Sequence, residues 1–267
     1  MPNSWILPVL ALFLASVASG AVGPLVVARR ATYMAGAVSH SMLAGIGLSI
    51  ALEAKCGISF LSPFAGSILV AVAAALILSH VSRKAGSRAD AALSGVWSGG
   101  FAIGMLLMAW STGDIVELEE YLLGSVMEVE GARLLQFAAL VPAVVFAVWL
   151  GYNKLLACAF DRELAGLRGV NVRVWEVVFN VLTALTVAML AYTVGILLAI
   201  AFLAIPAVAA GRLTGRLPVQ MALAGAFSLA SGLAGLAAEA ALGLPGSAVA
   251  VLAALTFDLA THVASRT

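Results

Sequence analysis

The chain has 267 residues, of which 63% are apolar and only 10% are charged, and its formal net charge is +1. A typical soluble domain carries about 25% charged residues, so this composition excludes an ordinary water-soluble fold and favours an all-α protein that crosses the lipid bilayer many times. The near-zero net charge and the lack of a long basic run give no sign of a nucleic-acid partner.

Nine segments are long and apolar enough to cross a membrane, for which a helix needs about 20 residues. We expect each of them to be helical, because backbone groups in lipid must satisfy their own hydrogen bonds. Only Thr193 separates the sixth and seventh segments, so eight spans with one re-entrant segment is the alternative count. In chain order the segments are Trp5–Ala28, Tyr33–Leu52, Phe60–Val81, Ala91–Trp110, Leu134–Gly151, Trp175–Tyr192, Val194–Ala210, Val219–Ala238 and Ser247–His262.

The first segment is predicted to remain in the protein as a helix. Its basic residues, Arg29 and Arg30, follow the apolar run instead of preceding it. A cleaved signal peptide has the opposite order, with a positive region before the apolar stretch.

Charged residues between the segments predict the orientation. The connections after odd-numbered segments carry Arg29, Arg30, Arg83, Lys84, Arg88, Lys154, Arg162, Arg168, Arg173, Arg212 and Arg216, and Arg266 follows the last segment. The other connections carry mostly acidic residues, with Lys55 and Arg133 as basic exceptions: Glu53, Asp114, Glu117, Glu119, Glu120, Glu128, Glu130 and Glu239. The positive-inside rule therefore places the N-terminus outside and the C-terminus in the cytoplasm. Cys56 and Cys158 then lie on opposite sides of the membrane and should not pair.

The sequence predicts a single transmembrane domain over residues 1–267 and no soluble domain. Its longest hydrophilic stretches are an external acidic loop at about 111–133 and a cytoplasmic loop at about 153–174. The chain has no G-x-x-x-x-G-K-[ST] phosphate-binding loop, so any hydrolysis of ATP must take place on another chain. We therefore expect this chain itself to hydrolyse no ATP.

Several short motifs, in order and spread over nearly the whole chain, resemble the ABC-type permease family that transports zinc, manganese and iron. The family patterns are R-R-x-[ST]-Y, [AS]-H-[AS], Y-L-F-G, F-D-x-E-x-A and V-G-x-L-L followed by I-P-A-x-x-A. The matching residues are Arg29-Arg30-Ala31-Thr32-Tyr33, Ser39-His40-Ser41, Asp90 with Gly104, Tyr121-Leu122-Leu123-Gly124, Phe160-Asp161-Arg162-Glu163-Leu164-Ala165, Val194-Gly195-Ile196-Leu197-Leu198, and Ile205-Pro206-Ala207 with Ala210.

The resemblance implies a transport subunit and not an enzyme, with the fold of an ABC importer permease and a set of partners. A separate ABC ATPase subunit would drive alternating access by docking on a short helix in the cytoplasmic loop, at Asp161, Glu163, Ala165 and Gly169. An ordinary solvated loop is the alternative there. A solute-binding protein would dock outside, where the acidic loop is otherwise a solvated face. The permease would form a homodimer or pair with a related permease in a bacterial cell membrane. Gly195 and Pro206 are expected to serve helix packing or gating.

The implied cargo is a divalent metal, zinc or manganese, and no resident cofactor is expected. His40 is the candidate metal ligand, with a neutral packed histidine as the alternative. Family members usually carry a carboxylate four residues before this histidine, on the same helix face. This chain has Gly36 there, and it has Ser98 where some relatives carry a second histidine. A drifted cargo, such as a chelated metal, is therefore an open alternative.

Asp258 and His262 form an i, i+4 pair in the last segment that could hold an ion, although a local hydrogen bond at the interface is the simpler interpretation. Two other functions stay open. A siderophore or vitamin B12 permease would have a similar architecture but a longer chain. A stand-alone secondary carrier or intramembrane enzyme would need no ATPase, but the spans contain neither HExxH nor GxSxG.

Overall fold

The computed structural model describes residues 5–85, 89–112, 121–122, 124, 129 and 131–265, and over these residues the protein is all-α. The helices are α1 (Ile6–Ala28), α2 (Thr32–Cys56), α3 (Pro63–Ala85), α4 (Ala89–Thr112), α6 (Gly131–Phe160), α7 (Arg162–Leu167), α8 (Val172–Val194), α9 (Ile196–Leu213), α10 (Leu217–Leu242) and α11 (Gly246–Ala264).

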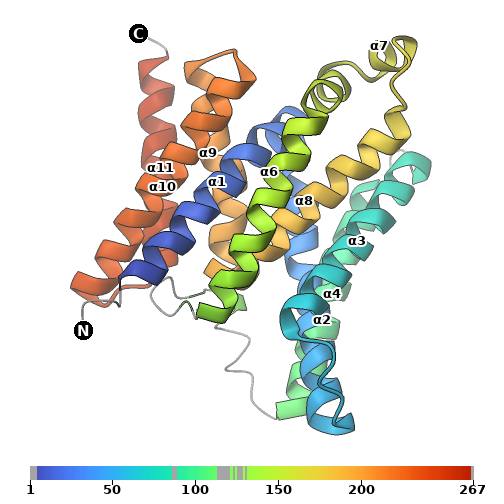
Figure 1. The fold of residues 1–267 in the computed structure, drawn as a ribbon, viewed down its shortest axis with the longest axis vertical. Coiled ribbons are helices and arrows are strands. Elements are labelled where there is room, and N and C mark those ends of the chain that lie inside the picture. The colour runs from blue at the N-terminus through green and yellow to red at the C-terminus, as the bar shows by residue number, and fades with distance from the viewer. Residues whose placement is uncertain are drawn as a thin grey trace.

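Nine of the helices in the described part of the chain are long and apolar enough to cross a membrane, which confirms the predicted polytopic bundle. They run alternately up and down, so the N- and C-terminal ends of the chain lie at opposite ends of the bundle (Figure 1). The short helix α7 lies at the same end as the C-terminus. We call this the α7 end and the other the far end.

The sixth and seventh predicted segments are two separate spans joined by one residue. Helix α8 ends at Val194 and α9 begins at Ile196, and Gly195 between them has φ 92° and ψ 154°. Only glycine adopts this backbone region readily. The single residue reverses the chain, because α8 descends and α9 returns toward the α7 end (Figure 1).

Helix α6 is longer than its apolar segment predicts. It continues to Phe160, so residues 153–160 of the expected cytoplasmic loop are helical. Leu155 and Cys158 in this extension are buried, because one apolar face of the helix continues past the last residue of the predicted span. The connection that carries α7 is consequently short, and α6 leads almost directly into it.

Close glycine contacts hold α2 to its neighbours. A Cβ on Gly45 would lie 2.1 Å from the carbonyl oxygen of Gly66 in α3, and one on Gly100 of α4 would lie 2.4 Å from the Cα of Ser41. Small residues at such positions let membrane helices approach closely. Gly95 and Gly99, on the same helix as Gly100, have no atom within 4 Å of a built Cβ, so α4 packs on α2 with only one of its faces.

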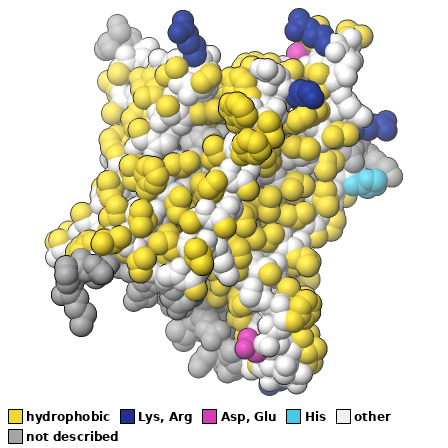
Figure 2. Space-filling view, viewed as in Figure 1, with side chains coloured by type: hydrophobic (Ala, Val, Ile, Leu, Met, Phe, Trp, Pro, Cys, Tyr) yellow, Lys and Arg dark blue, Asp and Glu magenta, His cyan; other side chains and the backbone are white. Residues whose placement is uncertain are grey.

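Burial divides the bundle into central and peripheral helices. In the most apolar 18-residue stretch of each helix, 72% of the residues are buried in α2 and in α8. The corresponding values are 11% in α4 and 22% in α11. The face drawn in Figure 2 is covered mostly by hydrophobic side chains, and its Lys and Arg side chains gather at the α7 end. Such a surface is stable against lipid or against another membrane chain.

Candidate functional site

His40 lies on α2, eight residues after its first residue Thr32, which corresponds to about 12 Å along the helix. Its imidazole stacks on Trp97 of α4 with ring centroids 4.8 Å apart, and it meets Phe101 edge to face at 5.8 Å. The Nδ1 atom is buried, and it has no hydrogen-bond partner among the described residues. A buried ring nitrogen needs a donor, a water or a metal ion as its partner.

Trp97 also occupies the space beside Gly36, where the family usually carries a carboxylate. A Cβ on Gly36 would lie 3.2 Å from Cζ3 and 3.3 Å from Cη2 of the indole. Glycine at this position is therefore matched to the tryptophan that covers it. Ser98, which follows Trp97, is exposed on α4. The indole, and not an acidic side chain, is the neighbour that this protein gives to His40.

Within the described residues, no group of three or more His, Cys, Asp and Glu side chains could hold a metal ion. His40 therefore offers one nitrogen as a possible ligand, and the rings of Trp97 and Phe101 pack against its imidazole. One such ligand in each of two facing copies, together with water, could hold a divalent ion transiently, whereas a tight zinc site usually has three or four protein ligands.

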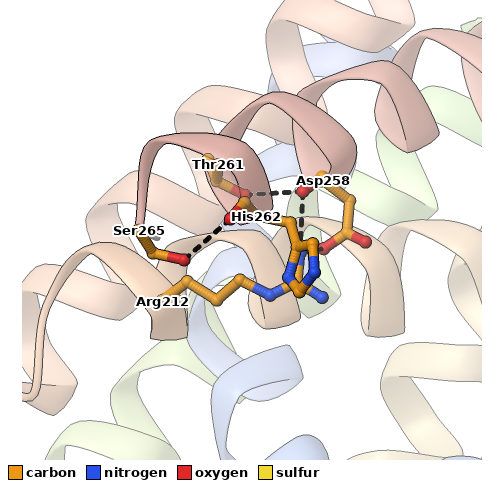
Figure 3. Close-up of polar contacts among 5 residues, drawn as sticks. All are labelled: Arg212, Asp258, Thr261, His262 and Ser265. Carbon is orange, nitrogen blue, oxygen red and sulfur yellow. Dashed lines mark hydrogen bonds and ion pairs between the residues drawn. The ribbon is translucent and has the colours of Figure 1, made fainter. Parts of the chain in front are cut away.

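Asp258 and His262 lie near the α7 end of α11, and the carboxylate of Asp258 pairs with Arg212 of α9 (Figure 3). The Nη1 atom of Arg212 donates to Oδ1 of Asp258 at 2.6 Å and to its backbone oxygen at 2.7 Å. Thr261 donates to the same backbone oxygen. No dashed contact joins the imidazole of His262 to Asp258 in Figure 3. The arrangement fastens α11 to α9 and leaves the carboxylate already paired with a cation.

The cytoplasmic motif of the sequence forms the short helix α7. Asp161 caps it by accepting a hydrogen bond from the backbone N–H of Leu164 at 2.9 Å, and Glu163 lies in its first turn. Ala165 is buried against the bundle. Gly169 has φ 80° just after the helix, where a left-handed residue ends helices. Each of the four predicted coupling residues therefore has a defined place in or beside α7.

Large apolar side chains are exposed on and beside α7, next to the charged Arg162 and Glu163, although the helix lies outside the spans. Leu167 is 85% exposed, Leu164 is 44% exposed, and Phe160 just before the helix is 74% exposed. Exposed leucine and phenylalanine side chains in an aqueous loop are typical of a surface that another protein covers. Figure 1 shows α7 projecting past the ends of the neighbouring helices.

A cluster of charges joins α7 to the bundle. Arg162 of α7 forms an ion pair with the largely buried Glu176 of α8 at 3.4 Å. Arg29, directly after α1, places its guanidinium 4.2 Å from the centroid of the Phe179 ring. Burial lowers the pKa of Arg29, as does the nearby Arg162, while Glu176 opposes the shift. An arginine remains charged regardless, so a positive charge is held near Arg162 of α7.

In the sequence Arg29 was a signal for orientation and part of the R-R-x-[ST]-Y motif, and Glu176 was not among the predicted site residues. The available signal was an acidic residue one turn into an otherwise apolar span, because a charge at that depth is costly unless it is paired. The partner could not be read from the sequence, since Arg162 and Glu176 belong to different helices.

Two of the family-like motifs meet at the far end. A Cβ on Gly124 would lie 2.5 Å from the carbonyl oxygen of Val194 and 2.7 Å from the Cα of Gly195. The backbone at Gly124 thus rests on the turn between α8 and α9. Pro206 lies inside α9 and is buried. The acidic residues of the external loop, from Asp114 to Glu130, lie outside the described residues.

The chain matches known proteins along nearly its full length. Residues 5–264 match the ABC 3 transport family. The manganese transport system membrane protein MntC of Halalkalibacterium halodurans is 30% identical over 246 residues, which are 92% of this chain and 82% of that one. A Chlamydia muridarum protein named "Probable metal transport system membrane protein" is 28% identical over 251 residues, which are 94% of this chain and 85% of that one.

The fold is also that of a solved structure. A chain of PsaBC from Streptococcus pneumoniae, solved in complex with a Fab, superposes with a TM-score of 0.86 at 24% identity, covering 97% of this chain and 91% of that chain. The full-length family match, the nine spans and the shared fold lead to one conclusion. The chain belongs to the ABC 3 transport family, and it is a multi-pass membrane transport subunit and not an enzyme.

Proposed function

We propose that this protein is the permease of an ATP-driven importer of a divalent metal ion, with manganese favoured over zinc. An ABC ATPase would bind at the α7 end in the cytoplasm, and a solute-binding protein would deliver the ion at the far end, outside the cell. Two permease chains, identical or related, would enclose the path. The manganese transport protein MntC among the relatives supports the choice of metal.

The observation that carries the proposal is α7. It is a capped helix in which Ala165 is buried and Leu167 is exposed. It lies at the end of the bundle where basic residues gather. A docked ATPase would cover this apolar surface. The ion pair between Arg162 and Glu176 would then carry a displacement of α7 into α8.

The sparsely covered helix α4 suggests where the second permease chain would lie. Its face with Gly95 and Gly99 has no neighbour within the described part of the chain. Small residues on an exposed membrane helix favour close packing of another helix. Because His40 reaches toward α4, this arrangement would bring the histidines of both chains near a shared axis.

A chelated metal is the second candidate cargo, and Gly36 favours it. Trp97 fills the place of the usual carboxylate, so the site has fewer ligands for a bare ion and more apolar surface for an organic chelate. A bare manganese ion needs oxygen ligands, which would have to come from water or from the partner chain.

The test is reconstitution with the partner ATPase and solute-binding protein, followed by uptake of manganese, zinc and one ferric siderophore into proteoliposomes. We expect ATP-dependent uptake that manganese saturates first. The same uptake rate without the ATPase would overturn the ATP-driven mechanism, and uptake of the siderophore alone would replace the cargo.

The docking surface has a specific variant. Leu167→Asp places a charge on the exposed apolar face of α7 and should reduce co-purification of the ATPase at least severalfold, because docking would bury that charge. Leu242→Asp is the matched control, since Leu242 is 70% exposed at the far end. Equal loss of the ATPase in both variants would show that α7 is not the docking helix.

A further inference from the structure

An open groove lies on the outer side of the bundle between α1, α6 and α10. It has a volume of about 630 Å³, and Val17, Gly20, Trp149, Ala222 and Gly225 are among its lining residues. This size is within the roughly 300–1,000 Å³ of sites that bury most of a small organic ligand. Ser16 is one of its few polar residues, and its hydroxyl donates to the carbonyl of Leu12 at 2.6 Å. The groove therefore offers an almost purely apolar surface.

The groove continues to the α7 end. A second hollow of about 420 Å³ shares Tyr152 and Pro218 with it and is also lined by Phe160 and Arg216. Along α6 the lining of the two hollows together runs from Val145 to Phe160, sixteen residues or about 22 Å of helix. Half of a bilayer that is about 40–45 Å thick has the same depth. The combined groove spans one leaflet.

The lining of the groove changes from apolar to basic toward the α7 end, as a phospholipid changes from its acyl chains to its charged headgroup. Apolar side chains line the deep part, Tyr152 lies where the two hollows meet, and Arg216 lies in the hollow at the α7 end. The Arg216 side chain is exposed, and neither a hydrogen bond nor an ion pair of its guanidinium is found among the described residues. Basic residues near the membrane surface attract anionic lipid headgroups.

From this complementarity we infer that the groove is a binding site for one anionic phospholipid of the leaflet at the α7 end. Its acyl chain lies between α1, α6 and α10, and its phosphate pairs with Arg216. A transmembrane helix of another chain is a poorer fit, because it would need a groove that crosses the whole bilayer. Below Val145 the groove closes, since Val141 and Phe137 of α6 are buried within the chain.

The site gives the lipid a means of influencing transport. Helix α6 forms one wall of the groove and ends at Phe160, and the next residue, Asp161, caps α7. A bound acyl chain restricts the movement of α6 against α1 and α10. Occupancy of the groove is therefore coupled to the position of the short helix at the end of the bundle.

The test measures bound lipid directly and needs no ATPase. Its outcome therefore does not depend on whether the proposed function is correct. The purified chain is loaded in nanodiscs of phosphatidylglycerol and phosphatidylcholine, released into the gas phase, and its retained lipid is identified by native mass spectrometry. We expect one retained phosphatidylglycerol. Ala222→Trp, which fills the groove, should lose it, whereas Ala230→Trp, on an exposed position of α10 outside the groove, should keep it.

Arg216→Gln should reduce the preference for phosphatidylglycerol over phosphatidylcholine severalfold, while Arg173→Gln, at another exposed position near the α7 end, should not. Equal lipid retention by Ala222→Trp and the unchanged chain would overturn the inference. Disulfide formation between two chains carrying Ala222→Cys together with Cys56→Ser would also overturn it, because the other native thiol is buried and a second copy would then occupy the groove.

Discussion

The immediate surroundings of His40 are aromatic. Stacking on Trp97 and the edge contact with Phe101 each stabilise the packed imidazole by about 0.5–1.5 kcal/mol. The same contacts leave Nδ1 buried and without a described partner. A packing role and a ligand role therefore predict different responses to substitution, since only the ligand role needs the nitrogens.

We predict that His40→Phe and His40→Ala both slow metal uptake severalfold without reducing assembly with the ATPase. Phenylalanine retains the ring contacts and removes both nitrogens. Uptake and complex yield are measured in the same proteoliposome preparations. Uptake at the original rate in His40→Phe, with a loss in His40→Ala, would reduce His40 to a packing residue.

Gly36 and Trp97 are predicted to be coupled. Gly36→Asp alone should destabilise the protein by about 1–3 kcal/mol, because its Cβ lies 3.2 Å from the indole and the core is overpacked. Adding Trp97→Ala should recover much of that loss. The double variant restores a carboxylate four residues before His40, so it should bind manganese more tightly than Trp97→Ala alone.

Thermal unfolding in detergent measures the stability of these variants, and calorimetry measures their manganese binding. Additive effects of the two substitutions on unfolding would contradict the coupling, because residues in contact are expected to deviate from additivity.

Two helix boundaries are each set by a single residue. Asp161 starts α7 by capping it, and Gly195 separates α8 from α9.

In α9 the buried Pro206 lacks an N–H, so the carbonyl four residues earlier has no helical partner there. Such a site is a natural point for a helix to bend, and Gly23 of α1 packs nearby, with a built Cβ 2.7 Å from the carbonyl oxygen of Leu203.

Gly195→Ala is predicted to destabilise the protein by about 1–3 kcal/mol, because a Cβ strains the backbone at φ 92° and ψ 154°. The control is Gly211→Ala in α9, where a Cβ meets no atom within 4 Å and alanine favours the helix. Unfolding of both variants is followed by far-ultraviolet circular dichroism in one detergent. Equal stability of the two variants would show that the turn is not strained.

At the scale of the whole molecule, the nine spans place the ends of the chain on opposite membrane faces. The α7 end carries Arg30, Arg168 and Arg173, so the positive-inside rule predicts that this end faces the cytoplasm. Cys56 closes α2 at the far end and is exposed, while Cys158 is buried. The two native thiols therefore report the orientation without any added label site.

A membrane-impermeant maleimide should label Cys56 in intact cells expressing the protein, because the far end is predicted to face outside. Cys56→Ser should abolish the labelling, since the remaining thiol is buried. Labelling of Cys56 only after the cells are opened would reverse the predicted orientation and, with it, the side on which the ATPase docks.

The sequence by itself determined the class of the protein and its spans. An apolar run of sufficient length must be helical in lipid, so nine such runs predicted nine helices. It also indicated the segment of α7, and it placed the break between the sixth and seventh spans at Thr193, two residues before the turn at Gly195. The extension of α6 to Phe160 was missed, because its apolar face is narrow and polar residues interrupt it.

Only the tertiary structure decided which residues meet. Trp97 covers Gly36 and His40, Arg212 pairs with Asp258, and Arg162 pairs with Glu176. Hydrophobicity specifies that a helix is in the membrane but says little about which of its faces meets which neighbour. That choice depends on the close approach of backbones and on the pairing of a few buried charges, which involve residues far apart in the chain.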